Sequence, residues 1–103
     1  MTPEERFASN LRLLREGREL SQEDLAWRAK IHRSQISPIE NGQCSPQFLT
    51  LIRLAGALGV TLNDLATGIT WTPAEFQPGS FGVGDGVDQL SESANVPELR
   101  AGL

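Results

Sequence analysis

Residues 20–42 read LSQEDLAWRAKIHRSQISPIENG, and this stretch decides the fold. Within it, apolar residues recur at helical spacing in two short runs that only a few residues separate. Ser21 stands directly before the first run with Asp24 three positions later, an approximate capping box. The stretch therefore predicts two helices, Gln22–Lys30 and Arg33–Glu40, joined by a tight turn.

Small and apolar residues in this stretch are placed to pack the second helix against the first. Ala26 is small where the helices would cross, and four aliphatic residues would lock them together: Leu25, Ile31, Ile36 and Ile39. The outward positions of the second helix stay free; they are Arg33, Ser34, Ser37 and Pro38. Two helices joined in this way let one cross the DNA backbone while the other enters the major groove. The pattern indicates a helix-turn-helix motif.

Three further helices are predicted around this pair. In the first, Phe7, Leu11 and Leu14 form one inward stripe, and Asn41-Gly42 after the reading helix suits a left-handed stop. The last two helices stop at Gly59 and Gly68. The three span about Pro3–Arg18, Gln47–Leu58 and Leu62–Ala66.

Three stretches, in this order and spacing, carry a family resemblance. They are Leu20-Ser21-Gln22-Glu23-Asp24-Leu25-Ala26, Ile39-Glu40-Asn41-Gly42 and Leu54-Ala55-Gly56-Ala57-Leu58-Gly59-Val60. Residues 7–68 resemble the phage-repressor and Cro-like helix-turn-helix regulators, the Xre family. The resemblance implies an all-α, five-helix, lambda-repressor-like domain. It also implies that Arg15 and Glu40 form a buried ion pair tying the first helix to the end of the third.

The resemblance also assigns roles in DNA binding. It makes Gln22 the glutamine that bonds a phosphate and braces the reading helix, and it makes Arg33 and Ser34 the principal base readers. An arginine can bond guanine O6 and N7 together, which discriminates by about 1–3 kcal/mol. Base reading is thus expected from Arg33, Ser34, Ser37 and Pro38. Phosphate contacts are expected from Gln22, Arg28, Lys30, His32, Asn41 and Gln43. For His32, the alternative is a role as the N-cap of the reading helix.

The sequence departs from the family pattern at three positions. Lys30 and Glu19 stand where relatives usually have glycine, so each is expected to sit in a left-handed conformation at some cost. Pro38 lies in mid-helix, where proline normally costs about 3 kcal/mol. Either the helix is short and bends there, or Pro38 makes an apolar contact such as one with a thymine methyl group. The alternative is a chain that has lost DNA reading and serves as a protein-interaction module.

The chain changes character after Gly68, where glycine and proline become frequent. Ile69–Thr72 and Ser80–Val83 are β-prone and predict a short hairpin within 69–83. We divide the chain into a domain at 1–68 and an extension at 69–103, with a flexible tail from about Gly84 and a weak helical end at 96–103. Two readings stay open for Trp71 and Phe81: a dimer contact, or a cover over the small core.

Charge is distributed unevenly. The net charge is −4, but residues 1–68 carry eight basic and eight acidic side chains. Residues 69–103 carry one basic and five acidic residues, which accounts for the whole excess. The acidity thus lies in the extension, and it does not argue against DNA binding by the helical domain.

Composition excludes several classes of site. Cys44 is the single cysteine and His32 the single histidine, so no internal disulfide and no zinc or other metal site is expected. No grouping of His, Cys or Ser with carboxylates suggests an enzyme, and no cofactor is expected. Residues 1–10 are charged from Glu4 onward and contain no apolar stretch, so no signal peptide is expected, and no apolar run approaches the ~18 residues of a membrane span. We expect a cytoplasmic protein, bacterial or phage-encoded, associated with the nucleoid when bound to DNA.

These observations predict a regulator of transcription, in the first place a repressor. It would bind double-stranded DNA as a homodimer on a two-fold operator with half-sites about 34 Å apart. The alternative is an antitoxin that represses its own operon while the tail from Thr72 onward wraps a protein partner.

Overall fold

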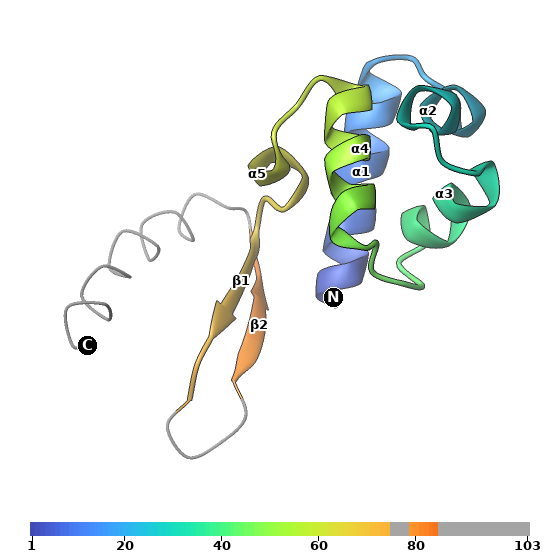
Figure 1. Cartoon of the computed structure of the whole chain (residues 1–103). Helices are drawn as coiled ribbons and strands as arrows, with labels where there is room; N and C mark the ends of the chain where they lie inside the picture. The colour runs from blue at the N-terminus through green and yellow to red at the C-terminus, as the bar shows by residue number, and fades with distance from the viewer. Residues whose placement is uncertain (75–78, 85–103) are drawn as a thin grey trace.

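The computed structural model describes residues 1–74 and 79–84 (Figure 1). These residues form five helices followed by two strands: α1 (Pro3–Gly17), α2 (Gln22–Ala29), α3 (Arg33–Glu40), α4 (Phe48–Leu58), α5 (Leu62–Leu65), β1 (Ile69–Thr72) and β2 (Ser80–Val83). The predicted order is confirmed, and each helix end falls within one residue of the expected one. The differences are capping residues: Arg18, Lys30 and Ala66 end helices as C-caps, and Gln47 precedes α4 as its N-cap.

Capping boxes begin three of the helices. The predicted box at α2 is present, since the Asp24 N–H donates to Ser21 Oγ at 3.0 Å and the Ser21 N–H donates to Asp24 Oδ2 at 3.1 Å. Thr61 and Asp64 make the same pair of bonds at α5. A further box, Thr2 with Glu5, begins α1. Each box satisfies two backbone donors that a helix N-terminus otherwise leaves unpaired.

The two expected left-handed residues are also observed. Glu19 has φ 56° and Lys30 has φ 59°, and they are the non-glycine residues with positive φ among those described. Gly42 has φ 71° just after Asn41, as expected for the stop of α3.

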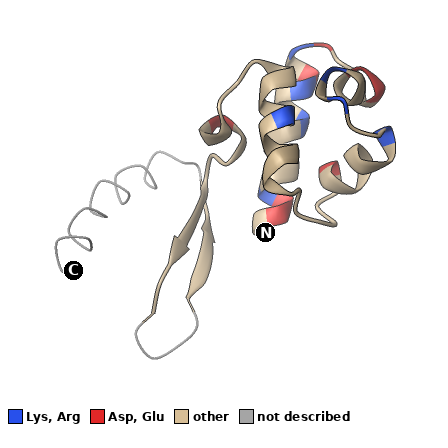
Figure 2. Cartoon of the chain, in the orientation of Figure 1, with Lys and Arg blue, Asp and Glu red and all other residues tan. Residues whose placement is uncertain are grey.

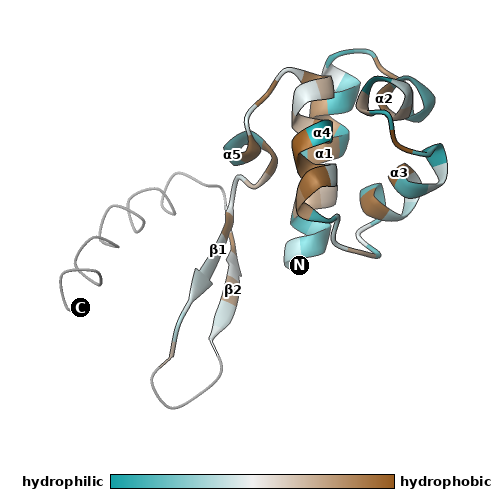
Figure 3. Ribbon diagram, viewed as in Figure 1, coloured by the Kyte–Doolittle hydropathy of each residue, from teal (hydrophilic) through white to brown (hydrophobic). Residues whose placement is uncertain are grey.

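Apolar side chains from all five helices meet in one core. α1 packs on α3 and α5, α2 packs on α3 and α4, and α4 packs on α5. The most deeply buried apolar side chains are Leu11, Leu25, Ile36, Leu54 and Leu65. Figure 3 shows that most of the α4 ribbon is hydrophobic. No helix among the described residues is long and apolar enough to cross a membrane.

The predicted hairpin is confirmed, and it projects from the bundle below α5 (Figure 1). Its base closes where the Gly84 N–H donates to the Gly68 carbonyl at 2.7 Å. A Cβ at Gly68, which has φ 87°, would lie 2.0 Å from the Gly84 carbonyl oxygen, so only glycine fits there. The expected tail from Gly84 and helical end at 96–103 fall almost entirely outside the described residues.

The aromatic pair of the hairpin does not cover the core. The rings of Trp71 and Phe81 lie directly across the strands, with centroids 5.0 Å apart in an edge-to-face arrangement. They remain 54% and 60% exposed. The reading of these residues as a lid over the core is therefore wrong, because the hairpin carries them beyond the helices and they pack on each other instead.

Candidate nucleic-acid interface

The turn between α2 and α3 is held on both sides of its left-handed residue. The Lys30 N–H donates to the Trp27 carbonyl at 3.3 Å, and the Ile31 N–H donates to the Ala26 carbonyl at 3.1 Å. Arg53 of α4 donates from Nη1 to the Lys30 carbonyl at 3.0 Å. These bonds fix the turn although Lys30 replaces the usual glycine. Arg53 had no predicted role, because nothing in the local sequence ties α4 to this turn.

One face of α3 is buried and the other is open. Ile36, Ile39 and Glu40 are buried, whereas Arg33, Ser34 and Gln35 are exposed and Ser37 and Pro38 are half-buried. The most accessible side chains are thus those of the first turn, where a helix end inserted into the major groove would meet base edges.

Pro38 does not interrupt α3, which continues as an α-helix to Glu40. Proline has no N–H to donate to the carbonyl four residues back, that of Ser34. Ser34 lies in the exposed first turn, where water can bond that carbonyl. Pro38 itself borders a shallow hollow of about 380 Å3 together with Gln35 and Pro46.

The two principal base readers expected, Arg33 and Ser34, have partners within the protein. Arg33 Nη1 lies 3.1 Å from Glu23 Oε1 in an exposed ion pair, with side chains 62% and 69% exposed. Ser34 Oγ lies 2.8 Å from His32 Nδ1, and that nitrogen also accepts from the Ser34 N–H at 3.2 Å. His32 is therefore the N-cap of α3, the alternative that the sequence left open. Glu23 was missed, because its partner lies on another helix.

Behind the open face, Glu40 is the centre of a buried polar cluster. Arg15 Nε and Nη2 donate to its carboxylate at 2.6 and 3.0 Å, and Gln22 Nε2 donates to Oε1 at 3.1 Å. Arg12 donates to the Glu40 backbone carbonyl. The hydrogen bond to Glu40 raises the pKa of Arg15 above its ordinary value, against the opposing effect of burial. The cluster ties α1 and the start of α2 to the end of α3, and so fixes how α3 is presented.

The expected phosphate-binding residues fall into two groups that flank α3. Lys30 and His32 precede its first turn, with Arg28 at the end of α2, while Asn41 and Gln43 follow its last turn. Gln22 is half-buried, and its amide nitrogen already bonds Glu40. These residues were expected as one set, and in the structure five of them lie at the two ends of α3.

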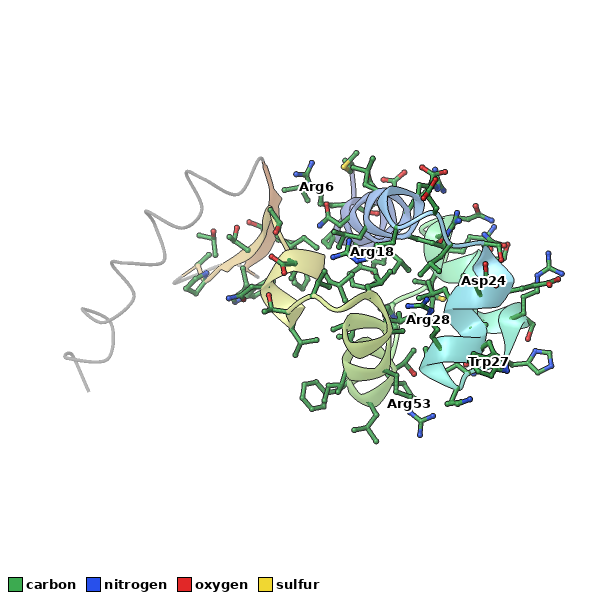
Figure 4. The ribbon with its side chains drawn as sticks, turned by 90° about the horizontal axis from the view of Figure 1, so that it is seen from above. Arg6, Arg18, Asp24, Trp27, Arg28 and Arg53 are labelled. Atoms are coloured by element: carbon green, nitrogen blue, oxygen red, sulfur yellow. The ribbon has the colours of Figure 1, made fainter. Side chains whose placement is uncertain are left out.

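Basic side chains gather at the end of α2. Arg28, Lys30 and Arg53 border a shallow hollow of about 510 Å3. Figure 2 shows basic segments on α1, α2 and α4 and in the turn, and Figure 4 shows Arg28, Arg53 and Trp27 on neighbouring parts of α2 and α4. Trp27 is 73% exposed, with the Lys30 ammonium 4.0 Å from its ring centroid. The geometry offers several cations beside an exposed helix start.

Comparison with known proteins gives the same motif. Residues 8–70 match the helix-turn-helix domain family. The chain is 36% identical over 64 residues to the HTH-type transcriptional regulator DdrOP3 of Deinococcus deserti, which covers 62% of this chain and 50% of that protein. It is 37% identical over 65 residues to the control protein C.MunI of a Mycoplasma species, which covers 62% of this chain and 88% of that one. The chain thus spans about half the length of the first relative and most of the second.

A solved structure shows a similar fold. The restriction-modification controller protein C.AhdI from Aeromonas hydrophila aligns with a TM-score of 0.59 and 34% identity. The alignment covers 60% of this chain and 94% of C.AhdI. Since the family match ends at residue 70, most of the hairpin lies beyond it.

Proposed function

The chain belongs to the Xre and Cro-like helix-turn-helix family, and on that premise we propose that it is a sequence-specific DNA-binding regulator of transcription. The observation that carries the proposal is the first turn of α3. There Arg33 and Ser34 are exposed on a helix whose opposite face is buried and braced through Glu40. A rigid helix that presents an arginine at its open start is suited to reading a guanine in the major groove.

Reading requires Arg33 to leave Glu23. An exposed ion pair of this kind contributes about 0–1 kcal/mol, whereas a bidentate arginine–guanine contact discriminates by about 1–3 kcal/mol. The base contact is the stronger, so Glu23 holds Arg33 in place without preventing the exchange. The Ser34 hydroxyl, which contacts His32, lies beside Arg33 in the first turn of α3 and offers a second polar contact to the bases.

Phosphate contacts on both sides of α3 set the register of the protein on DNA. We assign Arg28 and Lys30 to one side, and Asn41 and Gln43 to the other, while His32 caps α3 instead. Gln22 contributes with its second amide hydrogen, since a side-chain amide has two donors and Glu40 takes one. Phosphate contacts position the protein without reading sequence.

The regulator acts as a homodimer on a two-fold operator, in the first place as a repressor. In this proposal, residues 1–68 form the DNA-reading domain and residues 69–103 form an acidic extension. The reading domain has no net charge, so one copy attracts DNA weakly and a second copy adds affinity by holding two reading helices together. The unbroken α3 supports DNA reading over a pure interaction module, whose basis was a helix disabled at Pro38.

The comparisons favour one second candidate. The matched region spans 88% of C.MunI, which is named a control protein, and 94% of C.AhdI, which is named a restriction-modification controller protein. A controller of a restriction-modification gene set would use the same reading helix. The two candidates differ in the DNA they select.

Footprinting with genomic fragments, beginning with the DNA upstream of its own gene, tests the proposal. We expect protection of a short two-fold sequence that competitor DNA of unrelated sequence does not remove. Protection upstream of endonuclease or methyltransferase genes would favour the controller. Binding that shows no sequence selectivity even at low salt would overturn both candidates.

A further inference from the structure

One side of the molecule carries an apolar surface for which neither the core nor the reading helix accounts. A groove of about 260 Å3 opens between the beginnings of α1 and α4, α5 and the base of β1; Phe48 and Leu62 line it together with core residues. Ile52 lies one turn beyond Phe48 on α4, with Leu49 beside it, and all three are between 43% and 68% exposed.

The hairpin extends this surface outward. Ile69 pairs with Val83, and Trp71 pairs with Phe81 two residues further along. Because side chains alternate along a strand, all four lie on the same side of the hairpin. Ile69 lines the groove and packs against the core, so the exposed aromatic pair continues the wall of the groove. We call the exposed residues of this surface the apolar face: Phe48, Leu49, Ile52, Leu62, Trp71 and Phe81.

The apolar face is almost free of charge. Neither strand of the hairpin contains a charged residue, and the one charged residue that lines the groove is Glu4. The Glu4 carboxylate accepts a hydrogen bond from Ser45 Oγ at 3.2 Å. The apolar face offers no cation for a nucleic acid and few charges for a charged peptide. Its partner must therefore present an uncharged, apolar surface.

The size of the apolar face fits a protein partner. Aromatic side chains bury roughly 150–250 Å2 each and aliphatic ones less, so the three aromatic and three aliphatic residues, about half exposed, present on the order of 500 Å2. That is at the upper end of what a monomer leaves open. With a polar rim it approaches the ~800 Å2 per partner of a specific interface.

We propose that a second copy of this chain covers the apolar face, with Trp71 and Phe81 of each copy entering the groove of the other. The surface is complementary to itself, since it offers both a projecting aromatic pair and an apolar groove. An apolar cavity of about 150 Å3 already admits a benzene ring, and this groove is larger. A two-fold dimer uses the same patch twice, so each copy supplies both parts.

This arrangement also stabilises the hairpin and leaves the reading helix free. A two-stranded hairpin is only marginally stable in water unless another element packs against it. A second copy of the chain would supply that packing. α3 lies on the side of the bundle away from the hairpin (Figure 1). The inference rests on the proposed function in one respect, because a two-fold operator calls for a two-fold protein.

Sedimentation equilibrium of the full chain without DNA tests the proposal. We expect the wild type to be a dimer at micromolar concentration and the double variant Trp71→Ser, Phe81→Ser to be monomeric. Trp27→Ser is the matched control, because it removes an even more exposed tryptophan, from α2; this variant should remain dimeric. Circular dichroism should give the same helical content for all three. A monomeric wild type, or a double variant that dimerises as well as the wild type, would overturn the proposal.

A photo-crosslink tests the reciprocal contact. Chains with p-benzoylphenylalanine in place of Phe81 are prepared in 15N-labelled and unlabelled form, mixed and irradiated. Crosslinked peptides should join position 81 of one isotope to residues 44–52 or 62–69 of the other. Crosslinks confined to chains of one isotope, or crosslinks to α2 and α3, would contradict it.

The two proposals can fail separately. A chain that dimerises through the apolar face but shows no sequence-selective footprint overturns the proposed function alone. A chain that protects a specific site while monomeric at every concentration tested overturns the dimer contact and the homodimer, and leaves sequence-specific DNA binding standing.

Discussion

The Arg15 guanidinium lies bidentate against the Glu40 carboxylate, which is only 1% exposed. Removing one partner of a buried ion pair leaves the other charge unpaired, at a cost of about 3–5 kcal/mol. We therefore expect Arg15→Ala to lower the free energy of unfolding by that amount, measured by urea denaturation. Glu40→Gln should destabilise the fold as well, because its amide nitrogen must face one of the donors that the two carboxylate oxygens now accept.

The exposed pair of Glu23 and Arg33 is the control for this measurement. Glu23→Gln should change the free energy of unfolding by less than about 1 kcal/mol, since exposed pairs contribute little. If Arg15→Ala and Glu23→Gln lowered the free energy of unfolding equally, burial would not be what makes the ion pair of Arg15 and Glu40 the stronger one.

The capping box of α2 makes stability depend on pH. A hydrogen bond from the Ser21 backbone, aided by its side chain, holds the pKa of Asp24 below its ordinary value of 3.8. The unfolded chain therefore binds this proton more readily, so the stability is present above the ordinary pKa and is lost as pH falls through the lowered one. Asp24→Asn removes the titration, and we expect melting temperature to fall less steeply from about pH 5 to pH 2 than in the wild type. Identical slopes would contradict this.

The two left-handed residues provide a paired test of backbone strain. A non-glycine residue in this conformation costs roughly 1–2 kcal/mol, which glycine would relieve. Glycine also gives the unfolded chain more conformational freedom, which lowers stability by about 0.4–1 kcal/mol and offsets part of the gain. Glu19→Gly should thus raise the free energy of unfolding by about 0.5–1 kcal/mol. Lys30→Gly should raise it less, because it also removes the contact with Trp27. A larger gain from Lys30→Gly would show that this contact contributes nothing.

Helix positions, caps and the hairpin could be predicted because periodicity and turn residues are local signals. Ser21 with Asp24 marked the start of α2, and the β-prone residues at 69–72 and 80–83 marked the strands. Contacts between elements were harder: the Arg53 bond to the Lys30 carbonyl and the pairing of Glu23 with Arg33 depend on how helices cross. A sequence pattern states which side of a helix is inward, but not which long surface side chain on another helix it meets.

Base reading and phosphate anchoring should separate in the response to salt. Arg33→Ala removes a base contact, so we expect affinity for the operator to fall by about 1–3 kcal/mol, with relaxed preference at one base pair. Arg28→Ala removes a phosphate contact, so it should weaken binding to all sequences and reduce the slope of log K against log salt by about 1. The slope should change less in Arg33→Ala, because this variant loses a base contact and no phosphate contact. Titrations of operator and unrelated DNA at several salt concentrations measure both effects, and equal changes in the two variants would contradict the assignment of Arg33 to reading and Arg28 to anchoring.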